Sequence, residues 1–89
     1  MNVEITKDFE KQLRKLKNPT LTKYVATVVK NILDAKCITD INNIKKLVGH
    51  KDYFRIRIGD YRIGIYLDNK NTIWLSTIAH RKDIYTFFP

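Results

Sequence analysis

Four arginines are the residues of this 89-residue chain best suited to bind a charged ligand. Arg55 and Arg57 alternate with apolar residues. Arg62 follows five residues later, and Arg81 lies near the end of the chain. A guanidinium presents five N–H donors in a planar fork that matches the geometry of a phosphate group. Residue type and spacing therefore indicate a site for phosphate, provided that the fold brings these side chains together.

Side chains that could transfer a proton lie beside the last of these arginines. His80 directly precedes Arg81, and Tyr85 follows Arg81 by one helical turn. Imidazole is the side chain that changes charge nearest to physiological pH, and a phenol can donate or accept a proton. Tyr53 and Tyr66, like Tyr85, also offer rings on which an unpaired base could stack. These residues are candidates for catalysis and for nucleic-acid binding.

A predicted β-hairpin brings three of the arginines to one face of a sheet. Residues 53–58 alternate with a period of two, which puts Arg55 and Arg57 on the face opposite to the apolar side chains. A Gly-Asp pair then forms a two-residue turn, and a return strand over residues 61–67 places Arg62 on the same face. Cross-strand neighbours lie about 5 Å apart, so the guanidinium groups can converge. The alternative is an ordinary solvated face whose arginine stems cover apolar surface.

Two helices are predicted to cover the apolar face of this sheet and to leave the face with the arginines uncovered. Residues 2–6 alternate as a short strand does. Apolar residues then recur with helical spacing, and Thr6 or Asp8 is expected to cap this first helix. An Asn-Pro pair at 18–19 is typical of the start of a second helix, which has a broad apolar face. Because the connection is so short, the two helices are expected to form an αα-hairpin.

The rest of the chain is predicted to complete an α+β fold. Residues 37–50 are expected to form an irregular connector with one turn of helix or 3₁₀ helix, residues 72–79 a third strand, and residues 80–89 a short tail. The predicted architecture is an N-terminal strand and an αα-hairpin packed on one face of an antiparallel meander sheet. Because the chain has 89 residues and no linker or repeat, residues 1–89 are expected to form a single domain.

Composition limits the classes of protein that this chain can belong to. It has 17 basic and 9 acidic residues, a formal charge of +8 and a hydrophobic content of 44%, as expected for a folded protein that attracts polyanions. No apolar run approaches the ~20 residues of a membrane span and no signal peptide is evident, so we expect a cytoplasmic protein with no membrane partner. The single cysteine, Cys37, can form neither an internal disulfide nor a zinc site alone. No carboxylates are grouped as a two-metal nuclease requires, and no metal or cofactor is expected.

Two motifs resemble the RelE family of toxins from toxin–antitoxin systems. The first comprises residues 44–47 (IKKL) and 53–63 (YFRIRIGDYRI), and the second is residues 78–85 (IAHRKDIY). The resemblance extends over nearly the whole chain. It implies a RelE-like fold of the microbial ribonuclease type and an endonuclease that cleaves mRNA in the A site of the ribosome. The alternative is the sister ParE branch, which shares the fold but inhibits DNA gyrase and lacks the nuclease residues.

The resemblance also implies roles for individual residues. Arg55 and Arg57 match a basic pair, often lysines, that lies along the cut mRNA. Arg62 matches an arginine that contacts the scissile phosphate. Arg81 and Tyr85 match a basic residue and a tyrosine near the C-terminus of family members. Within the same motifs, further candidates for RNA binding are Lys45, Lys46 and Tyr53.

The implied reaction requires no metal. The ribose 2′-OH attacks the adjacent phosphate, which gives a 2′,3′-cyclic phosphate and a free 5′-OH. This chemistry needs a base for the 2′-OH, cations near the developing phosphorane and an acid for the leaving oxygen. Arg62 with Arg55 fits the role of the cations, and Arg81 would orient the phosphate or the leaving oxygen.

The base is predicted to be His80 or Tyr85. Arg57 is placed in the catalytic group by the resemblance, but it is a poor base because a guanidinium does not readily lose its proton. His80 stands where some family members have another basic residue. The presence of Arg62, Arg81, His80 and Tyr85 argues against the gyrase-inhibiting alternative, which has no need of them.

Charge and resemblance together predict the partners. A surface with a net charge of +8 is well complemented by an acidic, partly disordered antitoxin that folds on binding. The twelve lysines, most of them in the first half of the chain, would form a coat that docks on ribosomal RNA. The expected partners are therefore a cognate acidic antitoxin, the ribosome and mRNA. A nucleic-acid-binding module without catalysis is a third hypothesis, supported by charge alone.

Overall fold

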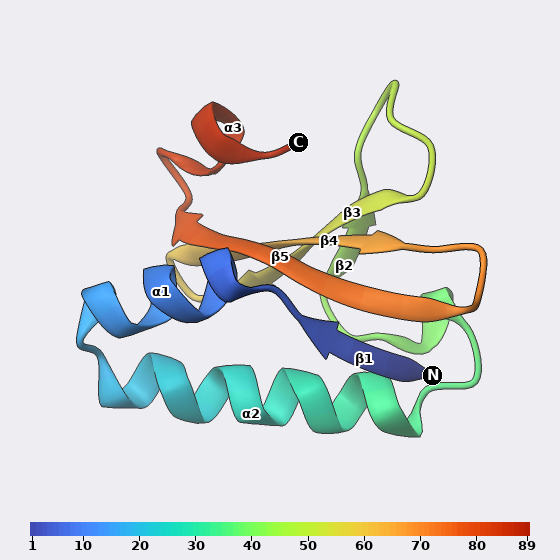
Figure 1. Ribbon diagram of the computed structural model, residues 1–89, viewed down its shortest axis with the longest axis horizontal. Helices are drawn as coiled ribbons and strands as arrows, with labels where there is room; N and C mark the ends of the chain where they lie inside the picture. Colours follow the sequence, from blue (N-terminus) through green and yellow to red (C-terminus); the bar gives the residue numbers. More distant parts are fainter.

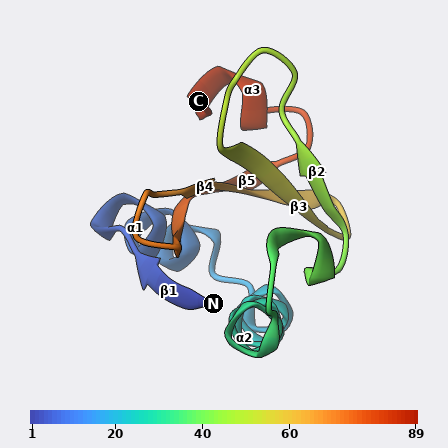
Figure 2. The ribbon, with the colours of Figure 1, turned by 90° about the vertical axis from the view of Figure 1, so that its right-hand side faces the viewer.

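The computed structural model describes residues 1–89 and shows a five-stranded sheet with two long helices on one face and a short helix on the other (Figures 1 and 2). The strand order is β1-β5-β4-β3-β2. The predicted α+β class is confirmed. In chain order, the elements are β1 (Asn2–Ile5), α1 (Lys7–Leu16), α2 (Pro19–Asp34), a 3₁₀ turn (Ile38–Asp40), β2 (Ile44–Lys46), β3 (Tyr53–Ile58), β4 (Tyr61–Leu67), β5 (Thr72–His80) and α3 (Ile84–Phe87).

Side-chain caps fix where the two long helices begin. The Thr6 hydroxyl accepts a hydrogen bond from the Phe9 N–H at 3.1 Å, so Thr6 rather than Asp8 caps α1. The Asn18 side chain accepts from the Leu21 N–H at 3.1 Å and caps α2, whose first residue is proline. Each cap satisfies a backbone donor that has no partner within the helix. The predicted αα-hairpin is confirmed.

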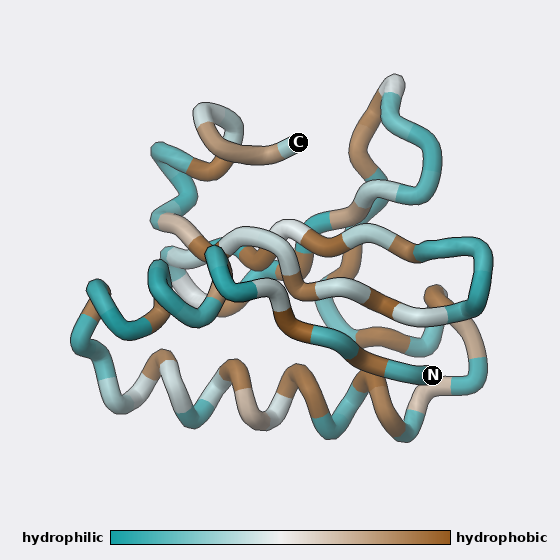
Figure 3. Tube along the Cα trace, in the orientation of Figure 1, coloured by the Kyte–Doolittle hydropathy of each residue, from teal (hydrophilic) through white to brown (hydrophobic).

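The main hydrophobic core lies between α1, α2 and the sheet. Its innermost side chains are less than 2% exposed and come from α1, α2 and the central strands; they include Phe9, Ile32, Ile56, Ile63, Ile65, Ile73 and Leu75. Along the central strands hydrophobic positions alternate with positions of intermediate or low hydropathy, whereas α1 is mainly hydrophilic (Figure 3). Burial of each such side chain contributes about 1.5–3 kcal/mol, and together they fix the register of the sheet.

The β3–β4 hairpin has the predicted register. Ile58 pairs with Tyr61, which leaves Gly59 and Asp60 as a two-residue turn. Gly59 has a φ of 61°, a conformation that glycine adopts without a steric cost. The side chains of β3 and β4 therefore alternate between the two faces of the sheet as the sequence predicted.

Two features of the sheet differ from the prediction. The connector over residues 37–50 contains the predicted 3₁₀ turn but also β2, which pairs antiparallel with β3. A strand of three residues is too short to show a period of two in the sequence. β1 pairs with β5 in parallel, with Asn2 opposite Thr72, so the sheet is mixed rather than an antiparallel meander. Local patterns do not report a pairing between residues about 70 positions apart in the chain.

The predicted short tail is partly helical and covers part of the sheet face that was expected to be open. α3 lies on the face opposite to α1 and α2 (Figures 1 and 2). It contributes Ile84 to a second hydrophobic cluster, in which Phe88 is also buried. The Phe88 N–H donates to the Ile84 carbonyl at 2.9 Å, so both residues are held on the side of α3 that faces the sheet. The prediction of an uncovered face was therefore wrong in this region.

None of the helices combines the length and the apolar composition that a membrane crossing requires. Nor does the structure place three or more histidine, cysteine, aspartate or glutamate side chains where they could hold a metal ion.

Candidate functional site

Three arginines share the face of the β3–β4 hairpin that points away from the main core. Arg57 lies directly opposite Arg62, and Arg55 lies opposite Gly64. The adjacent pair, Ile56 and Ile63, is buried on the other face. Because successive side chains on a strand point to opposite faces, the three arginines lie together on the side of α3. The structure confirms the placement that the alternation predicted.

Hydrogen bonds to the hairpin turn hold Arg62 in place. Its Nη1 donates to the carbonyl oxygens of Gly59 and Tyr61, each at 2.9 Å. Both bonds use the same nitrogen, so the remaining donors of the guanidinium are free to bind an anion. The turn therefore fixes Arg62 without occupying all the N–H donors of its guanidinium group.

Arg81 joins this group from the end of β5. Its backbone N–H donates to the Asp60 carbonyl at 2.8 Å, which fastens Arg81 to the hairpin turn. The pKa of Arg62 is lowered from its ordinary value, first by partial burial and then by the positive charges of the other three arginines, while Asp60 acts in the opposite direction. An anion bound among these guanidinium groups would relieve their repulsion. We call Arg55, Arg57, Arg62 and Arg81 the arginine cluster.

A surface pocket of about 340 Å³ opens beside the arginine cluster. Lys45, on β2, pairs with Arg55 across the strands and adds a further cation to the lining. Lys46 instead pairs with Phe54 and so lies on the other face of the sheet. The pocket is lined by Asn43, Ile44, Lys45, Arg55, Arg57 and Arg62. It combines positive charge with enough volume for part of a nucleotide.

Tyr85 lies over the arginine cluster. The Arg55 Cζ is 5.4 Å from the centroid of the Tyr85 ring, the geometry of a cation–π interaction. Tyr85 is 60% exposed, so its ring and hydroxyl remain accessible to a ligand. The Tyr53 ring is half-buried and packs against Tyr66 at 5.8 Å and Phe88 at 5.6 Å. Of the two tyrosines, Tyr85 is the one that faces the cluster.

His80 is not brought to the arginine cluster. It pairs with Tyr61, and the two rings meet edge to face at 5.6 Å. Arg62 pairs with Ala79 instead, so Arg62 and His80 lie on opposite faces of the sheet. The His80 Nδ1 accepts from the Lys82 N–H at 3.2 Å, which in a neutral ring leaves the proton on Nε2.

Sequence reasoning missed two further residues beside the site. Phe88 lies over Gly64, the cross-strand partner of Arg55. Trp74 stacks on Tyr66 with the ring centroids 6.0 Å apart, and its Nε1 donates to Asp68 at 2.9 Å. A glycine in the middle of an alternating strand often marks a close approach by another group, and Gly64 was the signal that could have pointed to Phe88.

Comparisons with known proteins identify the family. Residues 3–85 match the ParE toxin of type II toxin–antitoxin systems, parDE. Over 90 aligned residues, the chain is 36% identical to Toxin RelE3 of Methanocaldococcus jannaschii, and the alignment covers 100% of both proteins. The chain therefore belongs to the RelE/ParE family of toxins from type II toxin–antitoxin systems.

Within this family the chain is a toxin of the RelE type, and the ParE alternative is not favoured. The toxin–antitoxin complex RelB–RelE from Methanococcus jannaschii contains a similar chain, with 32% identity, a TM-score of 0.79 and coverage of 96% of this chain and 98% of that one. Two more distant structures share the fold. RelBE2 from Mycobacterium tuberculosis has 23% identity, a TM-score of 0.69 and coverage of 90% and 96%. RelE from E. coli has 19% identity, a TM-score of 0.70 and coverage of 96% and 90%.

Proposed function

We propose that this toxin is a ribosome-dependent endoribonuclease that cleaves mRNA in the A site by attack of the ribose 2′-OH, without a metal. The observation that carries the proposal is the arginine cluster on the α3 side of the sheet, with Tyr85 over Arg55. Four guanidinium groups without an equal number of carboxylates suit a ligand with several phosphates. Membership of the RelE type is consistent with this activity.

The proposed reaction divides among the residues of the cluster. A bond forms between the 2′-oxygen and phosphorus while the bond from phosphorus to the 5′-oxygen breaks, which leaves a 2′,3′-cyclic phosphate and a 5′-OH. Arg62 and Arg55 stabilise the negative charge of the pentacoordinate phosphorane. Arg81 orients the phosphate or the leaving oxygen. Arg57, which is exposed on the same face, binds the mRNA backbone.

Proton transfer is assigned to Tyr85 in preference to His80. Tyr85 lies over Arg55, whereas His80 lies against Tyr61 on the other face of the sheet. The phenolate form of Tyr85 can accept the proton of the 2′-OH, while water gives a proton to the leaving 5′-oxygen; the hydroxide so formed then restores the phenolate.

The proposed partners follow from the charge and from the solved relatives. The similar RelE chain from Methanococcus jannaschii was solved in complex with its antitoxin RelB. We expect this chain, with its net charge of +8, to bind a cognate acidic antitoxin. Its other proposed partners are mRNA and the ribosome, which would place the protein in the cytoplasm. Lys45 and Arg55 would contact the RNA backbone, and Lys46 and Tyr53 would lie at the margins of the RNA path.

Mapping of mRNA 5′ ends after induction of the chain tests the proposal. Wild type is expected to give cuts in phase with codons, and Arg62→Ala to lower the rate of cleavage on programmed ribosomes by about 10²–10³-fold. Arg14→Ala is the matched control, because Arg14 is an exposed arginine on α1, outside the cluster. Normal cleavage by Arg62→Ala, or an absence of cuts with the wild type, would contradict the proposal.

One observation is a reason to test a second function, inhibition of DNA gyrase, beside the first. The family description that matches residues 3–85 bears the name of ParE. A gyrase inhibitor would block DNA supercoiling in vitro and leave cellular mRNA intact. We expect the opposite result, with cleaved mRNA and unaffected supercoiling.

A further inference from the structure

The short helix α3 has a fixed position although it has only four residues. An isolated helix of this length is not stable in water, so contacts with the rest of the protein must hold it. In Figures 1 and 2, α3 lies on the sheet face opposite to α1 and α2, above β4 and β5. Its position determines where Tyr85 lies relative to the arginine cluster.

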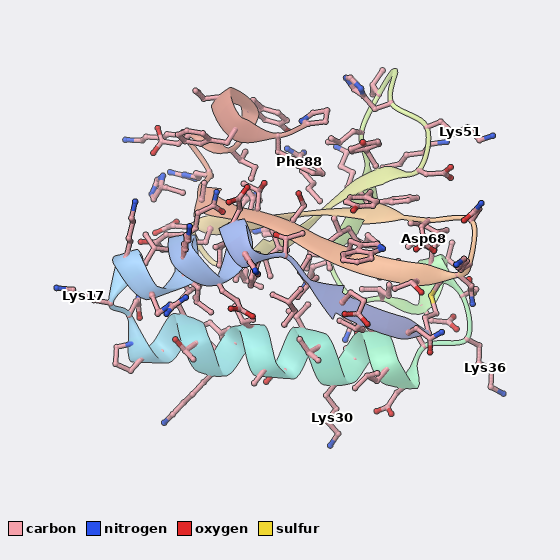
Figure 4. The ribbon with its side chains drawn as sticks, in the orientation of Figure 1. Lys17, Lys30, Lys36, Lys51, Asp68 and Phe88 are labelled. Carbon is pink, nitrogen blue, oxygen red and sulfur yellow. The ribbon has the colours of Figure 1, made fainter.

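Phe88, the residue that follows α3, packs on Gly64 of β4. Phe88 is 4% exposed, and its side chain lies between α3 and the sheet (Figure 4). A Cβ added to Gly64 would lie 2.5 Å from the Phe88 Cγ and 2.6–2.7 Å from the two Cδ atoms. No side chain at position 64 is compatible with Phe88 in this position. The missing side chain of Gly64 therefore creates the space that the Phe88 ring fills.

Other contacts complete the attachment. The Phe88 N–H donates to the Ile84 carbonyl at 2.9 Å, which joins Phe88 to the turn of α3. The Phe88 ring packs against the Tyr53 ring at 5.6 Å. Phe88 belongs to a buried cluster with Leu47, Ala79 and Ile84. Phe88 is thus part of a small core that lies apart from the main one and attaches α3 to the sheet.

This core is adjacent to the catalytic residues proposed above. Gly64 is the cross-strand partner of Arg55, and Arg55 lies under the Tyr85 ring at 5.4 Å. Phe88 is the C-cap of α3, directly after the four-residue turn that carries Tyr85, and its backbone is extended. Phe88 on Gly64 and Tyr85 on Arg55 are therefore contacts made by one short segment with two cross-strand partners.

We infer that Phe88 is a positioning residue for the toxin, and that its contact with Gly64 holds Tyr85 at the arginine cluster. Phe88 touches no reacting atom and acts through Tyr85 alone. The catalytic consequence rests on the proposed nuclease function, whereas the placement of Tyr85 by Phe88 does not. The two parts can therefore be tested separately.

Fluorine NMR of protein labelled with 3-fluorotyrosine tests the placement of Tyr85. The chain has five tyrosines, and Tyr85→Phe identifies the Tyr85 resonance by its loss. Phe88→Ala is expected to shift this resonance to the position that it has in the urea-unfolded protein. Phe87→Ala is the matched control, because Phe87 is the neighbouring phenylalanine and is 61% exposed. An unchanged Tyr85 resonance in Phe88→Ala, or an equal shift in Phe87→Ala, would overturn the inference.

Single-turnover cleavage on programmed ribosomes tests the catalytic consequence. Phe88→Ala is expected to lower the cleavage rate by the same factor as Tyr85→Ala, with ribosome affinity within twofold of wild type because the arginine cluster is intact. Adding Phe88→Ala to Tyr85→Ala should cause no further loss, because Phe88 acts through Tyr85. Phe88→Leu, which retains an apolar group on Gly64, should recover part of the rate. Additive losses in the double variant would contradict a positioning role.

Gly64→Ala provides an independent test from the other side of the contact. The added methyl group is expected to displace Phe88 and to shift the Tyr85 resonance as Phe88→Ala does. Combining Gly64→Ala with Phe88→Ala removes the overlap and should restore the melting temperature to that of Phe88→Ala alone. If Gly64→Ala alone does not fold but the double variant does, the clash between the added methyl group and the Phe88 ring is still demonstrated. If wild type cleaves no mRNA, the proposed function fails, and the NMR result still decides whether Phe88 holds Tyr85.

Discussion

Arg62 carries its positive charge in surroundings that disfavour it. Partial burial and the positive charges of Arg57, Arg55 and Arg81 lower the pKa of Arg62, and Asp60 offsets only part of this effect. At neutral pH all four guanidinium groups are nevertheless charged, so the unliganded protein bears their mutual repulsion. A phosphate bound among them removes part of that repulsion. The arginine cluster thus favours the bound state at the expense of the stability of the free protein.

Removal of one member of the cluster should therefore stabilise the protein and weaken its activity. Arg57 lies directly opposite Arg62. We expect Arg57→Gln to raise the free energy of unfolding by about 0.2–0.5 kcal/mol at low salt, since like charges at such positions repel. Thermal unfolding should show an increase in Tm of about 1–4 °C, which disappears at 1 M salt. A lower Tm for Arg57→Gln than for an Arg14→Gln control would show that repulsion in the arginine cluster does not destabilise the folded protein.

The two candidates for proton transfer should differ in their effect on cleavage. Tyr85→Phe removes the hydroxyl and keeps a ring over Arg55, and we expect it to slow single-turnover cleavage by about 10²-fold or more. His80→Ala should retain most of the rate, because the His80 ring lies against Tyr61. Tyr24→Phe on α2 is the control for loss of an exposed hydroxyl. Near-normal cleavage by both Tyr85→Phe and His80→Ala would refute both assignments.

Among the elements, those defined by local sequence were predicted and those defined by distant contacts were not. The caps at Thr6 and Asn18 and the turn at residues 59–60 follow from residues close in the chain, and the structure confirms them. The convergence of Arg55 and Arg62 was predictable because a two-residue turn fixes the register. The parallel pairing of β1 with β5 joins distant segments, as does the Gly64–Phe88 contact. The periodicity of hydrophobic residues along the chain does not indicate such contacts.

The β4–β5 turn should give the fold a measurable dependence on pH. The pKa of Asp68 is lowered, first by the hydrogen bond from the Trp74 Nε1 and then by that from the Thr72 N–H. Because the folded pKa lies below the unfolded value of about 3.9, the stabilisation is complete above that pH and is lost as the pH falls through the folded pKa. The urea midpoint of wild type should therefore decrease more between pH 5 and pH 3 than that of Asp68→Asn.

Trp74 is the only tryptophan of the chain, so its fluorescence can follow this unfolding. Asp34→Asn, a change at an exposed residue of α2, serves as the control for loss of a carboxylate. The midpoint rather than the intensity is compared, because Asp68 contacts the indole directly. If Asp68→Asn shows the same pH dependence as wild type, the turn does not contribute to it.

At the scale of the whole molecule, the positive charge is divided between two sides of the sheet. The arginine cluster lies on the side of α3. Many of the lysines lie on the other side: Lys17, Lys30 and Lys36 extend away from the body of the protein around α2 (Figure 4). Because the sheet separates the two groups, one could dock on ribosomal RNA while the other binds the mRNA. The net charge of +8 is therefore better described as two surfaces than as one.

These two surfaces should be separable by their response to salt. Each lysine that contacts an RNA phosphate contributes about one unit to the slope of log affinity against log salt concentration. We expect the triple variant Lys17→Gln, Lys30→Gln, Lys36→Gln to bind ribosomes more weakly and with a smaller slope, and to cleave at the wild-type rate once ribosomes are saturating. Arg62→Ala should show the reverse, with binding nearly unchanged and the saturated rate reduced. If the triple variant has the affinity and slope of wild type in filter-binding measurements, these lysines only solvate the surface, and ribosome docking must use the side that carries α3.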